Sequence, residues 1–230
     1  MANILIVDAS SHWCSVAVHT EHGDVALTEQ QPRRHAQRLL PMVDDALQQA
    51  NIARHQLQGV AYGCGPGSFT GIRIAAAVTQ GIALALDLPV LAVSSLQAIA
   101  QQYFQQQDDA ELCAVVTDAH MGEVFWGVYQ LTSGLAVALQ ADQVGSPEQC
   151  LRQLTDFNGA VVGDGLHLPA LAGLYGIADI AIEAGAMLPI VCASWQNGDF
   201  GELADHPPVY LRDGVAWKKL SEQPSLLKPI

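Results

Sequence analysis

Lysine and arginine are scarce in this sequence, and their shortage limits what the protein can bind directly. Ten Lys and Arg residues stand against 23 Asp and Glu residues, which gives a formal net charge of −13. Proteins that bind nucleic acids take much of their affinity from cationic side chains that displace counterions along the phosphates. We therefore expect this protein to reach any nucleic acid only through a partner.

Cysteine is also sparse, and no pair has the spacing of a metal site. The five cysteines are odd in number and far apart, which is typical of reduced, buried thiols. The histidines His12, His19, His22 and His120 stand singly, so we expect them on the surface or in loops. No cationic leader or cleavage site precedes the apolar run at residues 4–7, which predicts a cytoplasmic protein without a signal peptide.

Glycine, in contrast, is concentrated in residues 63–71, which read GCGPGSFTG. An apolar run precedes this segment and a helical run follows it, so the pattern predicts a strand, a tight turn and a helix capped by Ser68 or Thr70. Backbone N–H groups in such a turn can hold a phosphate. However, no Lys-Ser/Thr pair follows the glycines, and Thr70 stands where a dinucleotide-binding motif needs a third Gly or Ala. A purely structural turn is the favoured interpretation, with a phosphate site as the alternative.

The helix predicted at residues 72–86 is apolar on nearly all sides. Small side chains recur every fourth residue, at Gly71, Ala75, Thr79 and Ala83. Large apolar side chains form a second ridge, at Ile74, Val78, Ile82 and Leu86. Such a helix must be covered on more than one side. It is either a central helix of one domain, or a helix that packs on its own sheet and on a second protein. A membrane span is disfavoured, because the run is shorter than the ~20 residues that a bilayer requires.

The second half of the chain repeats the order of the first. The apolar run at 113–118 resembles that at 4–8, a hairpin follows in both halves, and residues 160–165 resemble 60–65. Length and the 50% hydrophobic content allow a sizeable core. We therefore predict an α/β fold of two tandem βββαβα-type halves with mixed sheets, at residues 1–105 and 106–230. In the first half, a helix is also expected at 34–50.

Asp8 and Asp118 end equivalent strands in this repeat. A two-fold arrangement places both at one cleft, where paired carboxylates can hold a hydrated Mg²⁺ against a triphosphate. Alternatively, each aspartate caps a turn with its side chain, which is the favoured interpretation.

Several segments together carry a family resemblance. Residues 65–74, GPGSFTGIRI, resemble the signature of the bacterial TsaB (YeaZ) family. So do His35 with the Leu-Leu-Pro at 39–41, and the segments 118–126, 208–212 and 215–219. On these motifs the chain is identified as a member of that family from its first strand to about Leu220.

The resemblance implies an actin-like ATPase (ASKHA, ribonuclease H-like) fold and a role in the N6-threonylcarbamoyladenosine (t6A) modification of tRNA at position 37. It implies a non-catalytic, cytoplasmic subunit that binds the catalytic subunit TsaD and is joined by TsaE, a P-loop ATPase. It also implies a homodimer when the chain is alone, and only indirect contact with tRNA. No cofactor is expected on this chain by itself, since ATP and Mg²⁺ are expected through the partners.

The resemblance places the partner interface on the helices at 34–50 and 72–86 and on the turn before the second of them. The expected contact residues are His35, Leu39, Leu40, Val43, Leu47, Pro66, Gly67, Ser68, Phe69, Thr70, Gly71, Arg73, Ile74, Ala75, Ala76, Val78, Thr79 and Ile82. If these residues face the partner, Ala75→Arg or Ala76→Arg abolishes pairing.

Catalysis by this chain itself is not expected. The related catalytic subunit holds a metal with a His-x-x-x-His pair, and the matching positions here are Ser95 and Ile99. Ile99 cannot bind a metal ion. A vestigial nucleotide site is expected at Asp8, Asp118, Gly163, Asp164 and Gly165. The loop at 10–14 has no glycine and carries the bulky Trp13, so nucleotide binding is expected to be weak or absent.

Two other functions are weighed against this one. The first is an actin-like, ATP-dependent kinase or ATPase with Asp8 or Asp118 as its essential carboxylate. The second is a dinucleotide-binding oxidoreductase, which is disfavoured by the incomplete glycine pattern and by the missing acidic residue for the ribose.

Overall fold

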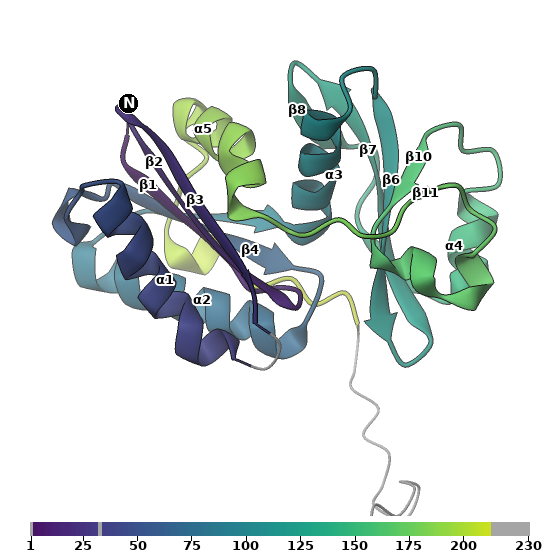
Figure 1. Cartoon of the computed structure of the whole chain (residues 1–230), viewed down its shortest axis with the longest axis horizontal. Coiled ribbons are helices and arrows are strands. Elements are labelled where there is room, and N and C mark those ends of the chain that lie inside the picture. The colour runs from purple at the N-terminus through teal and green to yellow at the C-terminus, as the bar shows by residue number, and fades with distance from the viewer. Residues whose placement is uncertain (1, 32–33, 213–230) are drawn as a thin grey trace, which may run out of the picture.

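The computed structural model describes residues 2–31 and 34–212, which form two lobes, each built on a mixed sheet (Figure 1). The first sheet has the order β3-β2-β1-β4-β5. Its strands are β1 (Ile4–Asp8), β2 (Trp13–Thr20), β3 (Gly23–Gln30), β4 (Gly59–Gly65) and β5 (Val90–Ser94). β2 and β3 run antiparallel to their neighbours, whereas β4 and β5 run parallel to β1.

The second sheet repeats this arrangement, which confirms the predicted duplication. Its order β8-β7-β6-β10-β11 matches that of the first sheet strand for strand. Its strands are β6 (Leu112–His120), β7 (Glu123–Thr132), β8 (Leu135–Ala138), β10 (Ala160–Val162) and β11 (Gly176–Ile177). The short strand β9 (Gln143–Gly145) pairs with β7. Again the first three strands are antiparallel and the last two are parallel. The predicted actin-like α/β architecture is therefore correct.

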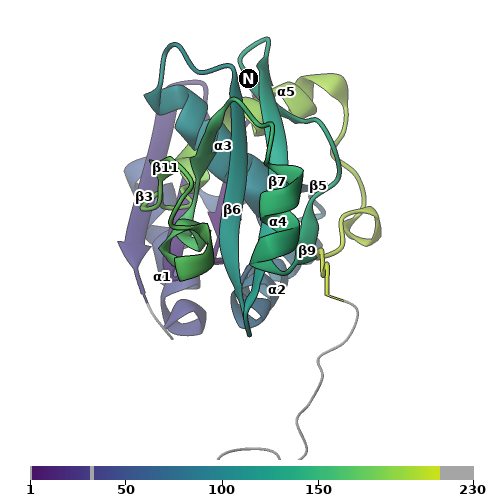
Figure 2. The same ribbon diagram turned by 90° about the vertical axis from the view of Figure 1, so that its right-hand side faces the viewer.

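Helices cover both faces of each sheet. Two of these helices pack on the sheet that is formed by the other half of the sequence. On the first sheet, α1 (His35–Gln49) and α2 (Phe69–Leu86) pack side by side on one face, and α5 (Leu188–Asn197) lies on the other (Figure 1). α3 (Ser95–Gln106) packs against the second sheet, with α4 (Pro147–Gln153) on its far side (Figure 2). α3 lies in the first half of the sequence but packs on the second sheet, and α5 lies in the second half but packs on the first sheet. The division of the chain at 105/106 therefore stays a prediction.

The strands at the centre of each sheet are apolar because both of their faces are covered. All five residues of β1 and all seven of β4 are buried. One core cluster joins the lobes, with Ile4 and Ile6 of β1 in the same cluster as Leu96 and Ile99 of α3 and Val115 of β6. The lobes therefore share one core.

Capping residues mark where α2 begins and ends. Ser68 is its N-cap, and the Ser68 hydroxyl accepts a hydrogen bond from the Gly71 N–H at 3.3 Å. Thr70, the other predicted cap, lies inside the helix, which begins three residues before the predicted 72. Asp87 ends α2 in the left-handed conformation, with φ 54°. The motif at 215–219 lies outside the described residues.

Candidate functional site: the outer face of α2 and the interlobe cleft

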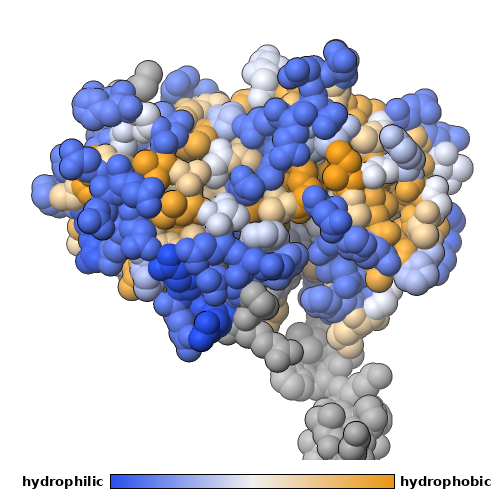
Figure 3. Space-filling view, viewed as in Figure 1, coloured by the Kyte–Doolittle hydropathy of each residue, from blue (hydrophilic) through white to orange (hydrophobic). Residues whose placement is uncertain are grey.

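The outer face of α2 is exposed and apolar. Leu84 is 76% exposed and Phe69 48% exposed, and Leu40 of α1 is likewise 48% exposed. Ala77, Gly81 and Ala85 are exposed as well, and Arg73 is the single charged residue of α2. Hydrophilic residues predominate at the lower left of Figure 3, where α1 lies. Of the exposed large apolar side chains, two belong to α2 and one to α1. We call this face, residues 69, 73, 77, 81 and 84 together with Leu40, the α2 face.

α2 is also the one helix of the described chain that is long and apolar enough to cross a membrane by length and composition. A single helix of this kind is weak evidence for a membrane span. One side of α2 packs against β4 and α1, through residues such as Ala75 and Ala83. The same apolar character therefore has a simpler cause, which is a helix packed on its own lobe and exposed on the opposite side.

The ridge of small residues faces inward. Gly71, Ala75, Thr79 and Ala83 are all buried. A Cβ atom on Gly71 would come within 1.8 Å of the Ala9 carbonyl oxygen, and one on Gly67 within 2.4 Å of the Ser10 carbonyl oxygen. The Ser68 N–H donates to that same Ser10 oxygen at 2.7 Å. The glycines thus let α2 and its preceding turn approach the end of β1, which supports the structural interpretation of the turn.

This packing corrects part of the predicted interface. Eight of the predicted contact residues are buried in the chain's own fold: Leu39, Val43, Leu47, Pro66, Gly71, Ala75, Ala76 and Thr79. Six are partly buried: His35, Gly67, Ser68, Ile74, Val78 and Ile82. Leu40, Phe69, Thr70 and Arg73 are exposed. Ala75→Arg and Ala76→Arg are therefore tests of the core and not of pairing. Ala77, Gly81 and Leu84 are exposed on the same side of α2 as Phe69 and Arg73, at a spacing of three to four residues, and were not among the predicted contact residues.

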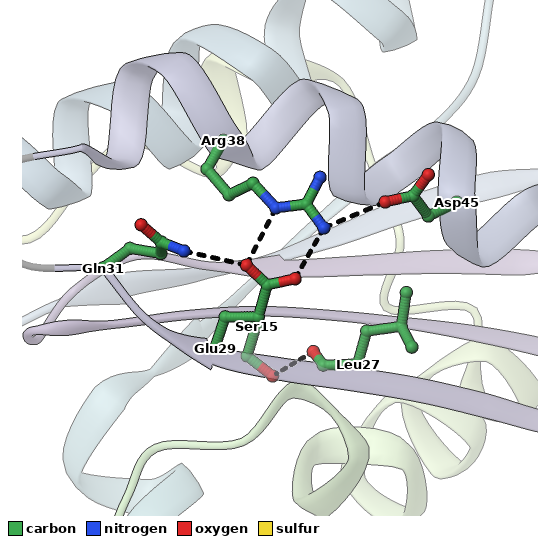
Figure 4. Close-up of polar contacts among 6 residues, drawn as sticks. All are labelled: Ser15, Leu27, Glu29, Gln31, Arg38 and Asp45. Atoms are coloured by element: carbon green, nitrogen blue, oxygen red, sulfur yellow. Dashed lines mark hydrogen bonds and ion pairs between the residues drawn. The ribbon is translucent and has the colours of Figure 1, made fainter.

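A polar network fixes α1 on the edge of the first sheet (Figure 4). The Arg38 guanidinium donates to both carboxylate oxygens of Glu29 on β3. It also donates, at 2.9 Å, to Asp45, which lies seven residues further along α1. Gln31 donates to the same Glu29 carboxylate at 2.9 Å. The hydrogen bonds from Arg38 lower the pKa of Glu29 to about 2. Arg38 thus joins α1 to the edge strand, while the buried apolar side of α1, which includes Leu39 and Val43, leaves Leu40 exposed.

A cleft of about 560 Å³ lies between the lobes. Its walls come from the β1–β2 loop, from the start of α1 and α2, from α3, and from the end of β6. Among its lining residues are Ser10, Ser11, His12, Trp13, His35, Ile99, Thr117, Asp118, His120 and Asp164. Trp13, from the segment at 10–14 that has no glycine, is thus part of the cleft wall.

The two aspartates of the repeat are not equivalent in this cleft. Asp118 lines it, whereas Asp8 is fully buried beneath the loop and does not. The Asp8 carboxylate accepts hydrogen bonds from the Ser10 N–H at 3.0 Å and from the Ser10 hydroxyl at 2.9 Å. Gly63 faces it so closely that a Cβ there would meet an Asp8 oxygen at 1.8 Å. Burial raises the pKa of Asp8 to about 7.

Asp118 and Asp164 are likewise bonded to nearby backbone. Asp118 accepts from the His120 N–H at 2.7 Å, and Asp164 accepts from the Asp118 N–H at 2.9 Å. Gly163 and Gly165 are buried and pack against Val116, so they are not among the residues that line the cleft. These bonds fit the turn-capping interpretation of Asp8 and Asp118.

The positions that match the metal-binding pair of the catalytic relative lie on α3. The Ser95 hydroxyl accepts from the Gly65 N–H at 3.2 Å, and Ile99 is buried. Within residues 2–31 and 34–212, no group of three or more His, Cys, Asp or Glu side chains is placed to hold a metal ion.

Comparison with known proteins agrees with this architecture. The family model TsaD, tRNA N6-adenosine threonylcarbamoyltransferase, matches residues 15–220. The tRNA threonylcarbamoyladenosine biosynthesis protein TsaB of Escherichia coli is 35% identical over 226 residues, which cover 94% of this chain and 97% of that protein. TsaB of Haemophilus influenzae is 34% identical over 229 residues, with 94% and 96% covered. The solved structure of YeaZ from Pseudomonas aeruginosa has a TM-score of 0.84 at 36% identity and covers 92% of this chain and all of that one.

These matches extend over both lobes. This chain therefore belongs to the TsaB (YeaZ) family of tRNA threonylcarbamoyladenosine biosynthesis proteins and has the TsaD-type, actin-like fold.

Proposed function

We propose that this chain is a non-catalytic, essential subunit of the bacterial t6A37 synthase complex, and that it binds and activates the catalytic TsaD subunit through the α2 face. The observation that carries the proposal is the exposed apolar surface of α2, where Leu84 and Phe69 project from the fold. An apolar patch of this kind is typical of a protein–protein contact. A specific interface usually covers ~1,600 Å² in total, which requires neighbouring residues of α1 such as Leu40 to take part.

Three features of the cleft support a non-catalytic role. Ile99 stands where a metal ligand is needed, Asp8 is buried away from the cleft, and Asp118 is engaged by the backbone of its own turn. We infer that ATP and Mg²⁺ act on the partners. The net charge of −13 favours tRNA contact through TsaD rather than through this chain. TsaE is proposed as the third subunit, and a cytoplasmic location follows from the reaction.

The experiment is a reconstitution with purified TsaD, TsaE, ATP, threonylcarbamoyl-adenylate and tRNA. We expect t6A formation to require this chain, although the chain has no activity alone. Leu84→Arg places a charge in the α2 face and is expected to abolish both TsaD binding and modification. Leu139→Arg is the control, because Leu139 is also an exposed leucine (55%, against 76% for Leu84) and lies on the second lobe. Full activity of Leu84→Arg would contradict the proposal.

A second candidate, an actin-like ATPase, is favoured by one observation, which is the cleft with Asp118 and Asp164 on its wall. It predicts phosphate release from ATP by the isolated chain above background, lost in Asp118→Asn. Phosphate release at background level would exclude this candidate while leaving the first untouched.

A further inference from the structure

Residues 206–212, here called the strap, run from the first lobe to the second (Figure 1, the yellow segment). The strap begins firmly attached to the first sheet. The Tyr62 hydroxyl on β4 donates to the His206 carbonyl oxygen at 2.7 Å, and the Val209 N–H donates to the Cys64 carbonyl oxygen at 2.8 Å. The Ala92 N–H on β5 donates to the His206 ring at 3.3 Å. The strap is therefore an ordered part of the fold.

The middle of the strap contacts the start of the α2 face. The rings of Tyr210 and Phe69 lie 5.5 Å apart, tilted by 53°. The Arg73 guanidinium lies 3.7 Å above the Phe69 ring, and its Nε donates to the Tyr210 hydroxyl at 3.2 Å. Arg73 is thus held by both rings, through cation–π attraction and one hydrogen bond. All three side chains are exposed, so a partner that covers the α2 face reaches this group directly.

The end of the strap holds the turn between β6 and β7. Arg212 donates to the carbonyl oxygens of Ala119, at 3.0 Å, and His120, at 3.2 Å, and forms an ion pair with Glu123. His120 and Met121 in this turn have φ values of 61° and 56°, in the left-handed region that residues with a Cβ rarely adopt. A guanidinium that binds two carbonyls and a carboxylate of one turn fixes its conformation.

The same turn forms part of the cleft wall. His120 lines the cleft, and its N–H bonds to Asp118, which lines it too. Phe69 and Arg73 contact Tyr210, Arg212 contacts the turn at 119–123, and the backbone of the strap connects Tyr210 to Arg212 two residues further on. We propose that the strap couples the α2 face to the cleft, so that a partner bound on α2 tightens the turn at 119–123 without touching it. Arg212 is the positioning residue of this coupling, which rests on the proposed function for the identity of the partner.

The coupling can be tested in the isolated chain by amide hydrogen exchange. Phe69→Ala removes the ring on which Arg73 and Tyr210 rest, and we expect exchange of the amides at 119–123 to quicken by about fivefold, at the low end of usual coupling. Leu84→Ala is a matched truncation on the same helix outside these contacts, and it should leave the turn within twofold of the wild type. Phe69→Tyr keeps an aromatic ring at this position, and its amides at 119–123 should exchange as slowly as in the wild type. An unchanged turn in Phe69→Ala would overturn the proposal.

A second experiment adds TsaD to the full chain. In the wild type we expect slower exchange both in α2 and in the turn at 119–123. In Arg212→Gln we expect α2 to stay protected while the turn loses its response, whereas Arg152→Gln, an exposed arginine on α4, should behave as the wild type. If the turn is still protected in Arg212→Gln, the strap does not carry the effect. If TsaD protects neither segment, the proposed function fails, and the isolated-chain experiment still decides the coupling.

Discussion

At the scale of single residues, Asp8 is the group with the clearest pH dependence. Its carboxyl is fully buried, and burial raises its pKa from 3.8 to about 7. The folded state therefore binds this proton more tightly than the unfolded state does. Below pH 4 both states hold the proton and Asp8 causes no penalty. As pH rises from 4 to 7 only the unfolded state releases it, so the free energy of unfolding falls across this window.

Asp8→Asn removes the ionisable group and keeps an oxygen that can accept from the Ser10 N–H. We expect the variant to be more stable than the wild type by about 2 to 4 kcal/mol at pH 8, and to be equally stable at pH 4. Urea denaturation at the two pH values measures the difference. Asp109→Asn, an exposed aspartate, is the control and should show no such trend. A stability difference for Asp8→Asn that is the same at both pH values would mean that Asp8 titrates normally.

At the scale of secondary-structure elements, α2 marks the limit of what sequence could predict. Its apolar character, its N-terminal turn and its need for cover on two sides followed from the residues. The rotation of the helix did not follow, because the small ridge and the large ridge are both apolar. A close backbone contact sets this rotation. Gly71 lies so near the Ala9 carbonyl that only the ridge of small residues can face β1. Hydrophobic periodicity does not report this closeness.

The rotation of α2 yields a prediction about two neighbouring alanines. Ala75 is fully buried, whereas Ala77 is exposed on the α2 face. Ala75→Arg forces a charge into the core and is expected to cost more than about 3 kcal/mol, so that the chain unfolds or aggregates. Ala77→Arg should fold normally and lose only partner binding. Circular dichroism, thermal melting and gel filtration with TsaD separate the two outcomes. A folded Ala75→Arg that merely fails to bind would show that the rotation of α2 is wrong.

At the scale of the whole molecule, the internal repeat predicted the fold well. The repeated order of runs indicated two mixed sheets, and the strand orders match. What the repeat could not show is that α3 leaves the first half to pack on the second sheet, while α5 returns to the first. Helical periodicity identifies an apolar face but not the sheet that covers it. The cleft was also only partly predictable, since the burial of Asp8 depends on the glycine at position 63 on the neighbouring strand.

Charge and the α2 face together predict how the chain associates with itself. Two copies that pair through α2 bring an apolar surface together, but each copy carries a net charge of −13. This repulsion is screened by salt, and hydrophobic contact is not weakened by it. We therefore propose that the chain dimerises through the α2 face, and we expect this association to tighten several-fold between about 0.05 and 0.5 M NaCl in sedimentation equilibrium.

The same surface is proposed for TsaD, so the two associations must exclude each other. Adding equimolar TsaD should replace the homodimer by a complex with one copy of each chain, and Leu84→Arg should be monomeric at every salt concentration. Leu139→Arg should dimerise as the wild type does. A homodimer that survives in Leu84→Arg, or that persists inside the TsaD complex, would place self-association on another surface and would leave the α2 face for TsaD alone.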